Sequence, residues 1–396
     1  MTAMIFDTKI TLEKLTKDGY SLSWTRKNQY DCCPAQWFIS NFCRIGGDLV
    51  LNPLMQENTY SIPGWVIQKL FETFINCRIY KMSSMKSLDD IYQWFDRNII
   101  AVCKTITHFT YDEQNNIVNS RSYFQTNEGK ALVQQHVLSD GLDPHIKGLQ
   151  LQFIDQSVFT QVNKSWDKFY ARLSKICHNI LNMWIQDKLN LDKMLCESFV
   201  HTYVGPSQQQ QFHIVGRTDF IYNNNMPDGM VFDDLAKLQP GFSLIDGKYN
   251  LSKFVHPEQL QLYNTVLYNM YKKVSSYIMF LDYNGCRYKA FQPDLNYKSY
   301  LTNCCAKMAN SVETCRSFLN QQVLQGNLAF DAQIAPVQFT PNDVGCSFCQ
   351  VKDCCDAYTN SSVKNSSEII SAKKQKEAVK KELDYLTPDE IHTITL

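Results

Sequence analysis

Two short apolar segments of this 396-residue chain each carry an acidic side chain that could bind a metal ion. The segment FHIVGRTDFIY places Asp219 in mid-strand, and FSLIDGKY places Asp246 and Lys248 two residues apart. Because strand side chains alternate with period two, Asp246 and Lys248 must project from the same face. Two carboxylates on adjacent strands offer a hard cation its oxygen ligands, and a neighbouring ammonium can orient or help deprotonate a water. The pattern predicts a metal site that activates water.

A helix follows the second acidic strand. The stretch HPEQLQLYNTVLYNMYKKV has Pro257 near its start and Lys272 and Lys273 at its end, as capping and dipole rules favour. Gln259 and Tyr263 are four residues apart and therefore lie on one helical face.

Three histidines compete for a place near this site. His178 lies in the helical pattern SWDKFYARLSKICHNILNMWIQDKL, among apolar residues, and precedes the first acidic strand. His201 and His213 are alternative candidates, and the sequence pattern does not show which of the three lies at the site. The acidic residues of the intervening loop are expected to be loop and cap residues: Asp228, Asp233 and Asp234.

Cysteines form a second constellation near the C-terminal end. Cys346, Cys349 and Cys355 follow the spacing C-x2-C-x5-C, with Cys354 adjacent, and Cys33 lies far upstream before a proline. Three or four thiolates at these spacings can bind zinc tetrahedrally or hold an iron-sulfur cluster, and the spacing does not discriminate between them. Most of the other cysteines are scattered and are expected to pack as small hydrophobic residues.

Composition favours a folded globular chain and excludes a globally basic one. Hydrophobic residues make up 44% and charged residues 20%, while Lys+Arg and Asp+Glu both number 39. Any polyanion site must therefore be local. We expect no secretory signal, because Asp7 interrupts the first residues, and no membrane span, because no apolar run is long enough. These features predict a soluble, cytoplasmic or otherwise intracellular protein with reduced or metal-bound cysteines.

The order of patterns predicts several segments. The stretch KITLEKL is strand-like, the patterns over 62–82 and 88–106 are helical, and SSYIMFLDYNGCRYKAF reads as a hairpin around Asn284-Gly285. No GxxxxGK[ST] stretch occurs, so no ATP-driven motor is expected. The segments divide the chain as follows: an N-terminal segment with the first cluster cysteine (1–44), a helical insertion or subdomain (45–164), the core of the chemistry (165–320), a cysteine-cluster segment (321–358) and a disordered tail (359–396).

In their order, these elements resemble the RecB-like branch of the PD-(D/E)xK nucleases. That branch has a helical His, a GxxD strand, a (D/E)xK strand and a QxxxY helix, which appear here as CHNIL, GRTDF, IDGKY and QLQLY. The resemblance implies an α/β core in which the acidic strands meet at one edge of a mixed sheet flanked by helices. The (D/E)xK pattern alone is common, whereas four elements in order are specific.

The resemblance also implies roles for single residues. Asp219, Asp246, the Gly247 carbonyl and His178 would bind Mg²⁺ or Mn²⁺. Lys248 would position or activate the attacking water, and Gln259 and Tyr263 would hold the scissile strand or brace Lys248. The rival interpretation is a structural ion pair between Asp219 and Lys248.

The cysteine pattern is similar to that of the iron-sulfur members of this branch, the AddB-type helicase-nuclease subunits and the CRISPR-adaptation nucleases. The similarity implies a 4Fe-4S cluster held by Cys33, Cys346, Cys349 and Cys355, which staples the two ends of the nuclease domain together. Structural zinc is the main rival.

These features together predict a metal-dependent DNA nuclease, acting as an exonuclease on single-stranded DNA or DNA ends in repair or recombination. A separate helicase or recombination protein would be a suitable partner. The alternative is a non-catalytic DNA-binding or assembly protein that keeps the nuclease scaffold, with zinc in the cysteine site.

Overall fold

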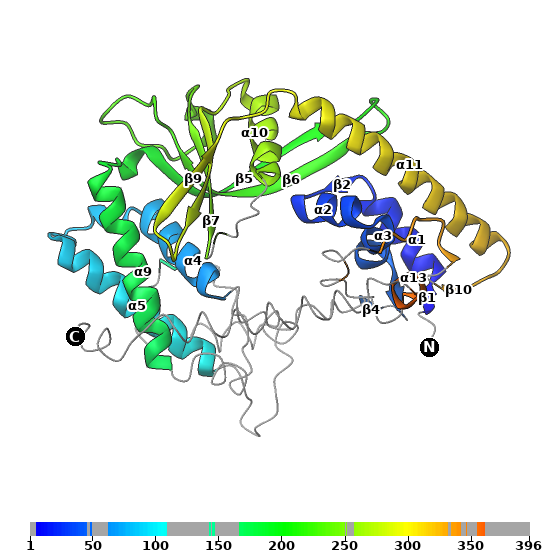
Figure 1. Cartoon of the computed structure of the whole chain (residues 1–396), viewed down its shortest axis with the longest axis horizontal. Helices are drawn as coiled ribbons and strands as arrows, with labels where there is room; N and C mark the ends of the chain where they lie inside the picture. Colours follow the sequence, from blue (N-terminus) through cyan, green and yellow to red (C-terminus); the bar gives the residue numbers. More distant parts are fainter. Residues whose placement is uncertain are drawn as a thin grey trace.

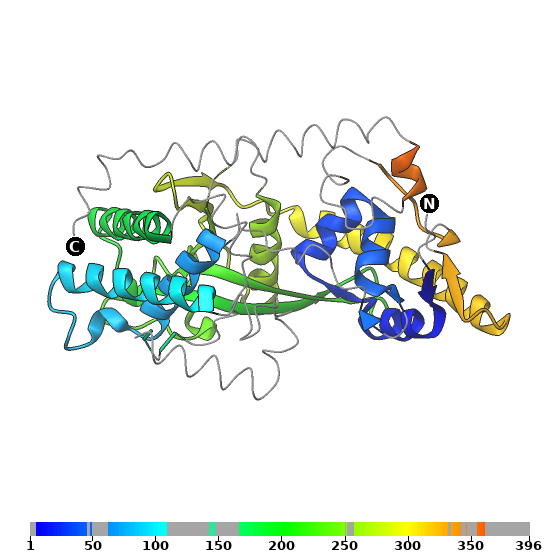
Figure 2. The same ribbon diagram turned by 90° about the horizontal axis from the view of Figure 1, so that it is seen from below.

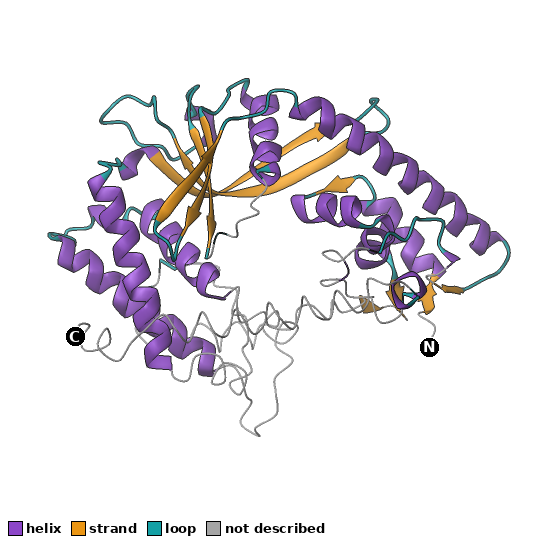
Figure 3. Cartoon of the chain, in the orientation of Figure 1, coloured by secondary structure: helices purple, strands orange, loops and turns teal. Residues whose placement is uncertain are grey.

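The chain folds as a mixed α/β structure in which helices flank one mixed sheet (Figure 3). The computed structural model describes residues 5–45, 48–49, 62–108, 142–143, 145–146, 166–249, 251, 257–331, 334–341, 346 and 355–360. The described elements form an arch, with the sheet and three helices at one end and the N-terminal helices at the other (Figure 1). The predicted fold class is confirmed to this level.

The central sheet places the two acidic strands next to each other. Its strands are β5 (Met194–Val204), β6 (Phe212–Tyr222), β7 (Ser243–Lys248), β8 (Tyr277–Asp282) and β9 (Arg287–Phe291), joined in that order. All neighbouring pairs are antiparallel except β7–β8, which is parallel. A short strand, β2 (Ser21–Leu22), pairs in parallel with the start of β6, at His213 and Ile214.

One turn and one helix agree directly with the sequence pattern. The predicted hairpin is confirmed, since β8 and β9 pair around the Asn-Gly turn, and the Gly285 N–H donates to Asp282 Oδ1 at 3.0 Å. The second acidic strand is followed by α10 (Glu258–Tyr271), with Pro257 at its N-cap and Lys272 in the left-handed region at its C-cap. The predicted helix and its limits are therefore confirmed.

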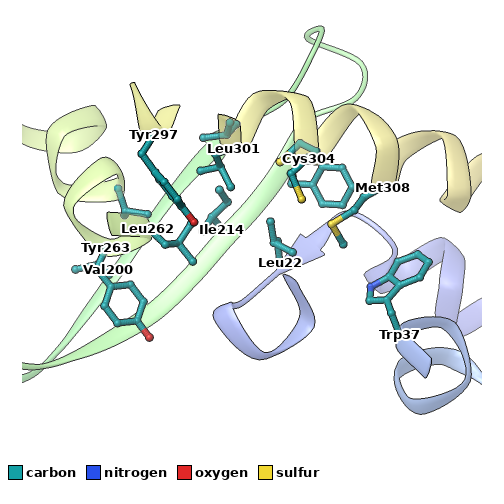
Figure 4. Close-up of a cluster of buried hydrophobic side chains, with 14 of the residues drawn as sticks. Leu22, Trp37, Val200, Ile214, Leu262, Tyr263, Tyr297, Leu301, Cys304 and Met308 are labelled. Atoms are coloured by element: carbon teal, nitrogen blue, oxygen red, sulfur yellow. The ribbon is translucent and has the colours of Figure 1, made fainter. Parts of the chain in front are cut away.

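Two hydrophobic clusters divide the interior. The first lies between the sheet, α10, α11 (Tyr297–Leu324) and the N-terminal helices, and includes Leu262, Leu301 and Trp37 (Figure 4). The second lies between the sheet and three helices, which are α4 (Ile62–Asn76), α5 (Leu88–His108) and α9 (Trp166–Gln186). The described helices of the 45–164 block thus share a core with the strands instead of packing alone.

The long hairpin β5–β6 contributes to both clusters because it twists. Ile214 and Ile221 point to opposite faces of β6 by alternation, yet both are buried in the first cluster, while Phe220 lies in the second. Two-stranded ribbons twist strongly, so residues of opposite parity meet the same neighbours at the two ends. In Figure 1 this ribbon runs from the sheet toward the N-terminal helices.

The N-terminal segment is helical where a strand was expected. KITLEKL lies in α1 (Thr8–Asp18), which Asp7 caps by accepting the Ile10 N–H at 2.8 Å. Thr8, Thr11 and Leu15 are buried at three- and four-residue spacing, which a strand could not produce. The strand prediction was wrong because this capping signal outweighs the β-branched residues.

Two further helices complete the N-terminal part, α2 (Trp24–Cys32) and α3 (Pro34–Phe42). Pro34 occupies the first turn of α3, where its fixed φ suits the helix and its missing N–H costs no hydrogen bond. Short β-bridges follow between β3 (Arg44–Ile45) and β4 (Asp48–Leu49).

Residues from the two ends of the sequence meet beside these helices. Strand β1 (Ile5–Asp7) pairs antiparallel with β10 (Ala329–Asp331), which follows α11. The Ala35 N–H donates to the Gln338 carbonyl at 3.1 Å. A short helix, α13 (Asp356–Thr359), lies at the same end of the molecule as β1 and β10 in Figures 1 and 2. The ends are therefore joined by backbone pairing; the predicted tail, apart from its first two residues, lies outside the described residues.

Among the described residues, no helix is long and apolar enough to cross a membrane.

One buried lysine connects the N-terminal helices to the rest. Lys27 of α2 is fully buried, and its Nζ lies 2.6 Å from Asp31 and 3.6 Å from Glu258 at the start of α10. The ammonium also lies 5.3 Å from the Trp24 ring centre and 5.0 Å from that of Tyr300 on α11. Three elements thus depend on one charge.

We expect Lys27→Ala to reduce the free energy of unfolding by about 2–4 kcal/mol, because a buried charge with two partners and two ring contacts is removed. Lys237→Ala is the matched control. Its partner Asp233 lies 2.6 Å away, but both side chains are more than half exposed, so the loss should stay below about 0.5 kcal/mol. Chemical denaturation of both variants tests this, and equal losses would contradict it.

Candidate functional site

The two acidic strands place their carboxylates side by side. The pairing Phe220↔Ile245 continues so that Asp219 lies beside Asp246 on one face of the sheet. The Gly247 N–H donates to Asp219 Oδ2 at 2.7 Å, which fixes that carboxylate against the second strand. The first expectation, two carboxylates on adjacent strands, is therefore realised in the geometry.

Lys248 and the following helix complete a connected network. Lys248 Nζ lies 2.5 Å from Asp246 Oδ2. Gln259 Nε2 donates to Asp246 Oδ1 at 3.0 Å, and its Oε1 accepts from Lys248 Nζ at 3.4 Å. The Gln259 amide also lies 3.5 Å from the Tyr263 hydroxyl. Gln259 therefore contacts the side chains of Asp246, Lys248 and Tyr263 at once and fixes their relative positions.

The glycine of the GRTD segment explains how the helix approaches. A Cβ at Gly216 would overlap the ring of Tyr263, so only glycine lets α10 pack this closely over β6. Three residues after Gly216, Asp219 then comes under the same helix. The spacing of GxxD and QxxxY thus reflects one steric contact between strand and helix.

Burial sets the electrostatics of the site. Burial and the neighbouring charge of Asp246 raise the pKa of Asp219 well above its usual range. Burial raises the pKa of Asp246 as well, against the opposing charge of Lys248. Burial alone would lower the pKa of Lys248, but the two carboxylates raise it overall, so the side chain is an ammonium. The two carboxyl groups therefore lie beside one positive charge, that of Lys248.

The other face of the sheet supports the site through residues that the sequence did not reveal. Tyr283 packs its hydroxyl against Gly247, where a Cβ would overlap it, and donates to Gln68 Oε1 of α4. Gln68 Nε2 donates to the Asp219 carbonyl at 3.3 Å. Glutamine and tyrosine carry no distinctive spacing signal, so only the fold shows that the helical block reaches the site.

A third acidic residue lies next to Asp219. Glu197 on β5 stands opposite Asp219 in the ladder, with φ of 50°, and its neighbours pair regularly on both sides. Burial and the charge of Glu72 raise the pKa of Glu197. A non-glycine residue in this conformation is uncommon and often marks a functional site. An acidic residue at this strand position had no motif to identify it.

His178 is held by other groups. Its Nε2 lies 2.9 Å from Asp96 Oδ1 of α5, and its ring stacks on Tyr92 at a centre distance of 4.1 Å. Within the described contacts, the network of Asp219 and Asp246 does not include it. The structure therefore joins three of the four motif elements in one network; the fourth helix packs on the sheet, but its His178 side chain pairs with Asp96 instead.

The other candidates lie where their patterns suggested or on a separate surface. Asp234 caps a short 3-10 helix (Leu235–Lys237), and Asp228 and Asp233 pair with lysines, as expected of loop and cap residues. His201 and His213 lie on the β5–β6 ribbon with their ring centres 5.5 Å apart.

Cysteines from both ends of the sequence come together near α3. Cys33 caps α3, and its Sγ accepts the Thr340 N–H at 3.4 Å. Cys355 Sγ accepts the Tyr358 N–H at 3.4 Å, and burial, followed by the charges of Cys33 and Cys346, raises the pKa of Cys355. Backbone N–H donors to sulfur are typical of metal-bound thiolates. Cys349 lies outside the described residues.

Among the described residues, no group of three or more His, Cys, Asp or Glu side chains is arranged so that it could hold a metal ion. A cation at the acidic site would therefore take two carboxylates and complete its coordination with backbone oxygen and water, as Mg²⁺ commonly does.

No protein-family model matches the chain, and no curated protein is significantly similar to it.

We expect Gly216→Ala to destabilise the protein by about 1–3 kcal/mol, because the new methyl group displaces the Tyr263 ring. Gly64→Ala is the control: its Cβ would lie at an ordinary 3.4 Å from Tyr249, and alanine suits the helix, so stability should be unchanged or higher. A double-mutant cycle with Tyr263→Ala should show that the two losses do not add. Simple additivity would refute the contact.

Proposed function

We propose that this protein is a metal-dependent deoxyribonuclease with a RecB-like PD-(D/E)xK core. The observation that carries the proposal is the single network of Asp219, Asp246, Lys248, Gln259 and Tyr263, drawn from two strands and one helix. The close fit of Gly216 under Tyr263 supports the same assignment, because it makes the two separate motifs parts of one contact.

The residues present suit Mg²⁺ or Mn²⁺. Asp219 and Asp246 offer hard oxygen ligands, and the Gly247 carbonyl follows Asp246 directly in the chain. Burial raises the pKa of both carboxyl groups, and the charge of Asp246 raises that of Asp219 further, so a divalent cation would favour their ionised forms. When bound, the cation would neutralise charge on a phosphodiester and make a water more acidic. This set needs no contribution from His178.

The protein's own groups would then orient the reactants. Lys248 is protonated and 40% exposed at its side chain, so it can donate to a phosphate oxygen or to the attacking water while still touching Asp246. Gln259 keeps the lysine and Asp246 aligned. The proposed substrate is DNA, as single strands or duplex ends, cut as an exonuclease does.

The same proposal includes a structural cluster at the cysteines. Cys33, Cys346 and Cys355, with Cys349 as the fourth ligand, would hold a 4Fe-4S cluster, with zinc as the rival. Support comes from the N–H donors at two sulfurs and from the meeting of residues 33–35 with 338–340.

A second candidate is a non-catalytic DNA-binding or assembly protein on the same scaffold. The pairing of His178 with Asp96 favours it, since one motif element is then unused at the site. It predicts DNA binding without metal-dependent cleavage.

Purified protein should degrade DNA with Mg²⁺ or Mn²⁺, and Asp246→Asn or Lys248→Ala should lower the rate by at least about 100-fold, because charge neutralisation and water activation are lost. Asp233→Asn, an exposed loop acid, is the matched control and should cleave normally. End-labelled single- and double-stranded substrates read out the rate and the polarity.

A second readout separates catalysis from binding. Mg²⁺ or Mn²⁺ should raise the melting temperature of the wild-type protein and of Asp233→Asn, but not that of Asp246→Asn, because only a bound cation stabilises the folded state. Cleavage that survives both Asp246→Asn and Lys248→Ala would disprove the nuclease assignment, whereas metal binding without cleavage would favour the second candidate.

Anaerobically purified protein should be brown, absorb at about 400 nm and contain iron and acid-labile sulfide. Cys355→Ser should lose the metal, because one thiolate ligand is removed. Cys77→Ser, at an exposed cysteine, should keep it. Colourless protein with stoichiometric zinc would favour zinc, and the absence of both metals would refute the cluster.

A further inference from the structure

An exposed row of rings lies on the β5–β6 ribbon. Phe199, His201 and Tyr203 alternate along β5, and the side chains of Phe199 and Tyr203 are 55% and 58% exposed. The ring of His213 on β6 stacks on Tyr203 at 4.8 Å and lies 5.5 Å from that of His201. The ring of Phe199 lies 5.7 Å from that of His201. The four rings are therefore continuous.

The buried face of the same ribbon does not need these rings. Val200 and Ile214 point into the first hydrophobic cluster, where Figure 4 shows them below α11 and α10. By alternation, Phe199, His201 and Tyr203 occupy the opposite face. Large apolar rings exposed together cost solvation free energy, and such patches commonly mark binding surfaces.

The row leads to the candidate active site. Phe199 pairs with Arg217 across the ribbon, and Arg217 precedes Asp219 by two residues on the same strand face, about 7 Å along it. The Arg217 side chain is 66% exposed, and its Nη1 lies 3.8 Å from Glu197 Oε2, which leaves other guanidinium N–H groups to face solvent. Apart from Glu197 and Asp219 themselves, β5 and β6 contain no acidic residue. A negatively charged backbone could therefore follow the row as far as the site carboxylates.

We propose that this row, Phe199, His201, Tyr203 and His213 with Arg217, binds single-stranded DNA and guides it to the site. The inference rests on the proposed nuclease function. Same-face strand residues are about 7 Å apart, so an extended strand can stack successive bases on successive rings. Arg217 then offers a cation to the phosphate nearest the carboxylates. Because stacking on rings does not distinguish one base from another, the row should bind DNA of any base sequence.

The test is fluorescence anisotropy with a labelled oligo-dT of about 20 nucleotides, in EDTA at one fixed salt concentration, because such binding depends on salt. Phe199→Ala and Tyr203→Ala should each weaken binding by about tenfold, and the double variant by more. Tyr277→Ala is the matched control: this strand tyrosine is 45% exposed at the start of β8, away from the row, and its loss should change nothing.

Two further measurements keep the proposal independent of the nuclease assignment. Turnover of the small phosphodiester bis(p-nitrophenyl) phosphate with Mn²⁺ should be the same in the double variant as in wild type, because this substrate does not reach the row. Tryptophan emission of Tyr203→Trp should be quenched by oligo-dT. If the wild-type protein cleaves no substrate while DNA binding still depends on the rings, the nuclease function is disproved and the DNA-binding role of the row is supported.

Equal DNA affinity of the double variant and wild type would overturn the proposal that the row binds DNA. Absent quenching in Tyr203→Trp would overturn it as well. A change of the double variant from dimer to monomer in light scattering, with unchanged DNA affinity, would assign the rings to self-association and overturn it as well.

Discussion

One buried and one partly buried carboxylate next to one ammonium are the constraint on which the rest of the structure depends. Charges can be buried in this way only if backbone and side chains hold them in place. The Gly247 N–H holds Asp219, and Gln259 holds Asp246 and Lys248. Gln259 reaches them because α10 lies against β6 at a glycine, and Gly247 is held because Tyr283 and α4 support it from the other face. Both layers of helices therefore act on one charged site.

Because the β5–β6 ribbon twists, one hairpin contributes to the hydrophobic core, to the charged site and to an exposed surface. Near the sheet, it brings Asp219 to β7 and Phe220 into the second cluster. Farther out, Val200 and Ile214 are buried in the first cluster, while Phe199 and Tyr203 on the opposite face are exposed. Glu197, with its positive φ, lies on β5 between the site carboxylates and the exposed rings that begin at Phe199. A flat ribbon would keep one face in one environment, whereas a twisted ribbon can join a core, a charged site and a surface within eleven residues.

The sequence predicted those features that depend on local spacing. Both acidic strands, the capped helix with Gln259 and Tyr263, and the Asn-Gly hairpin all follow from residues that are close in the chain. It did not predict which helices cover the second face of the sheet, because Gln68 and Tyr283 meet across 215 positions and belong to no motif. His178 shows the same limit: its helical pattern was correct, but the pairing with Asp96 depends on how α5 and α9 pack. The strand expected at KITLEKL failed for a local reason, the Asp7 cap.

The meeting of the chain ends bears on how the cysteine region relates to the acidic site. Backbone pairing of β1 with β10 and of Ala35 with Gln338 already joins the ends, so a cluster would reinforce an existing contact instead of creating it. The same N-terminal helices carry Lys27, which pairs with Glu258, the residue before Gln259. Cys304 on α11 also donates to Asp31, the other partner of Lys27, at 3.7 Å. Because a buried charge is costly to leave unpaired, displacement of α2 would disturb the first turn of α10, where Gln259 begins its reach to Asp246. The cysteine region and the acidic site are thus connected through one ammonium, in addition to the shared hydrophobic cluster.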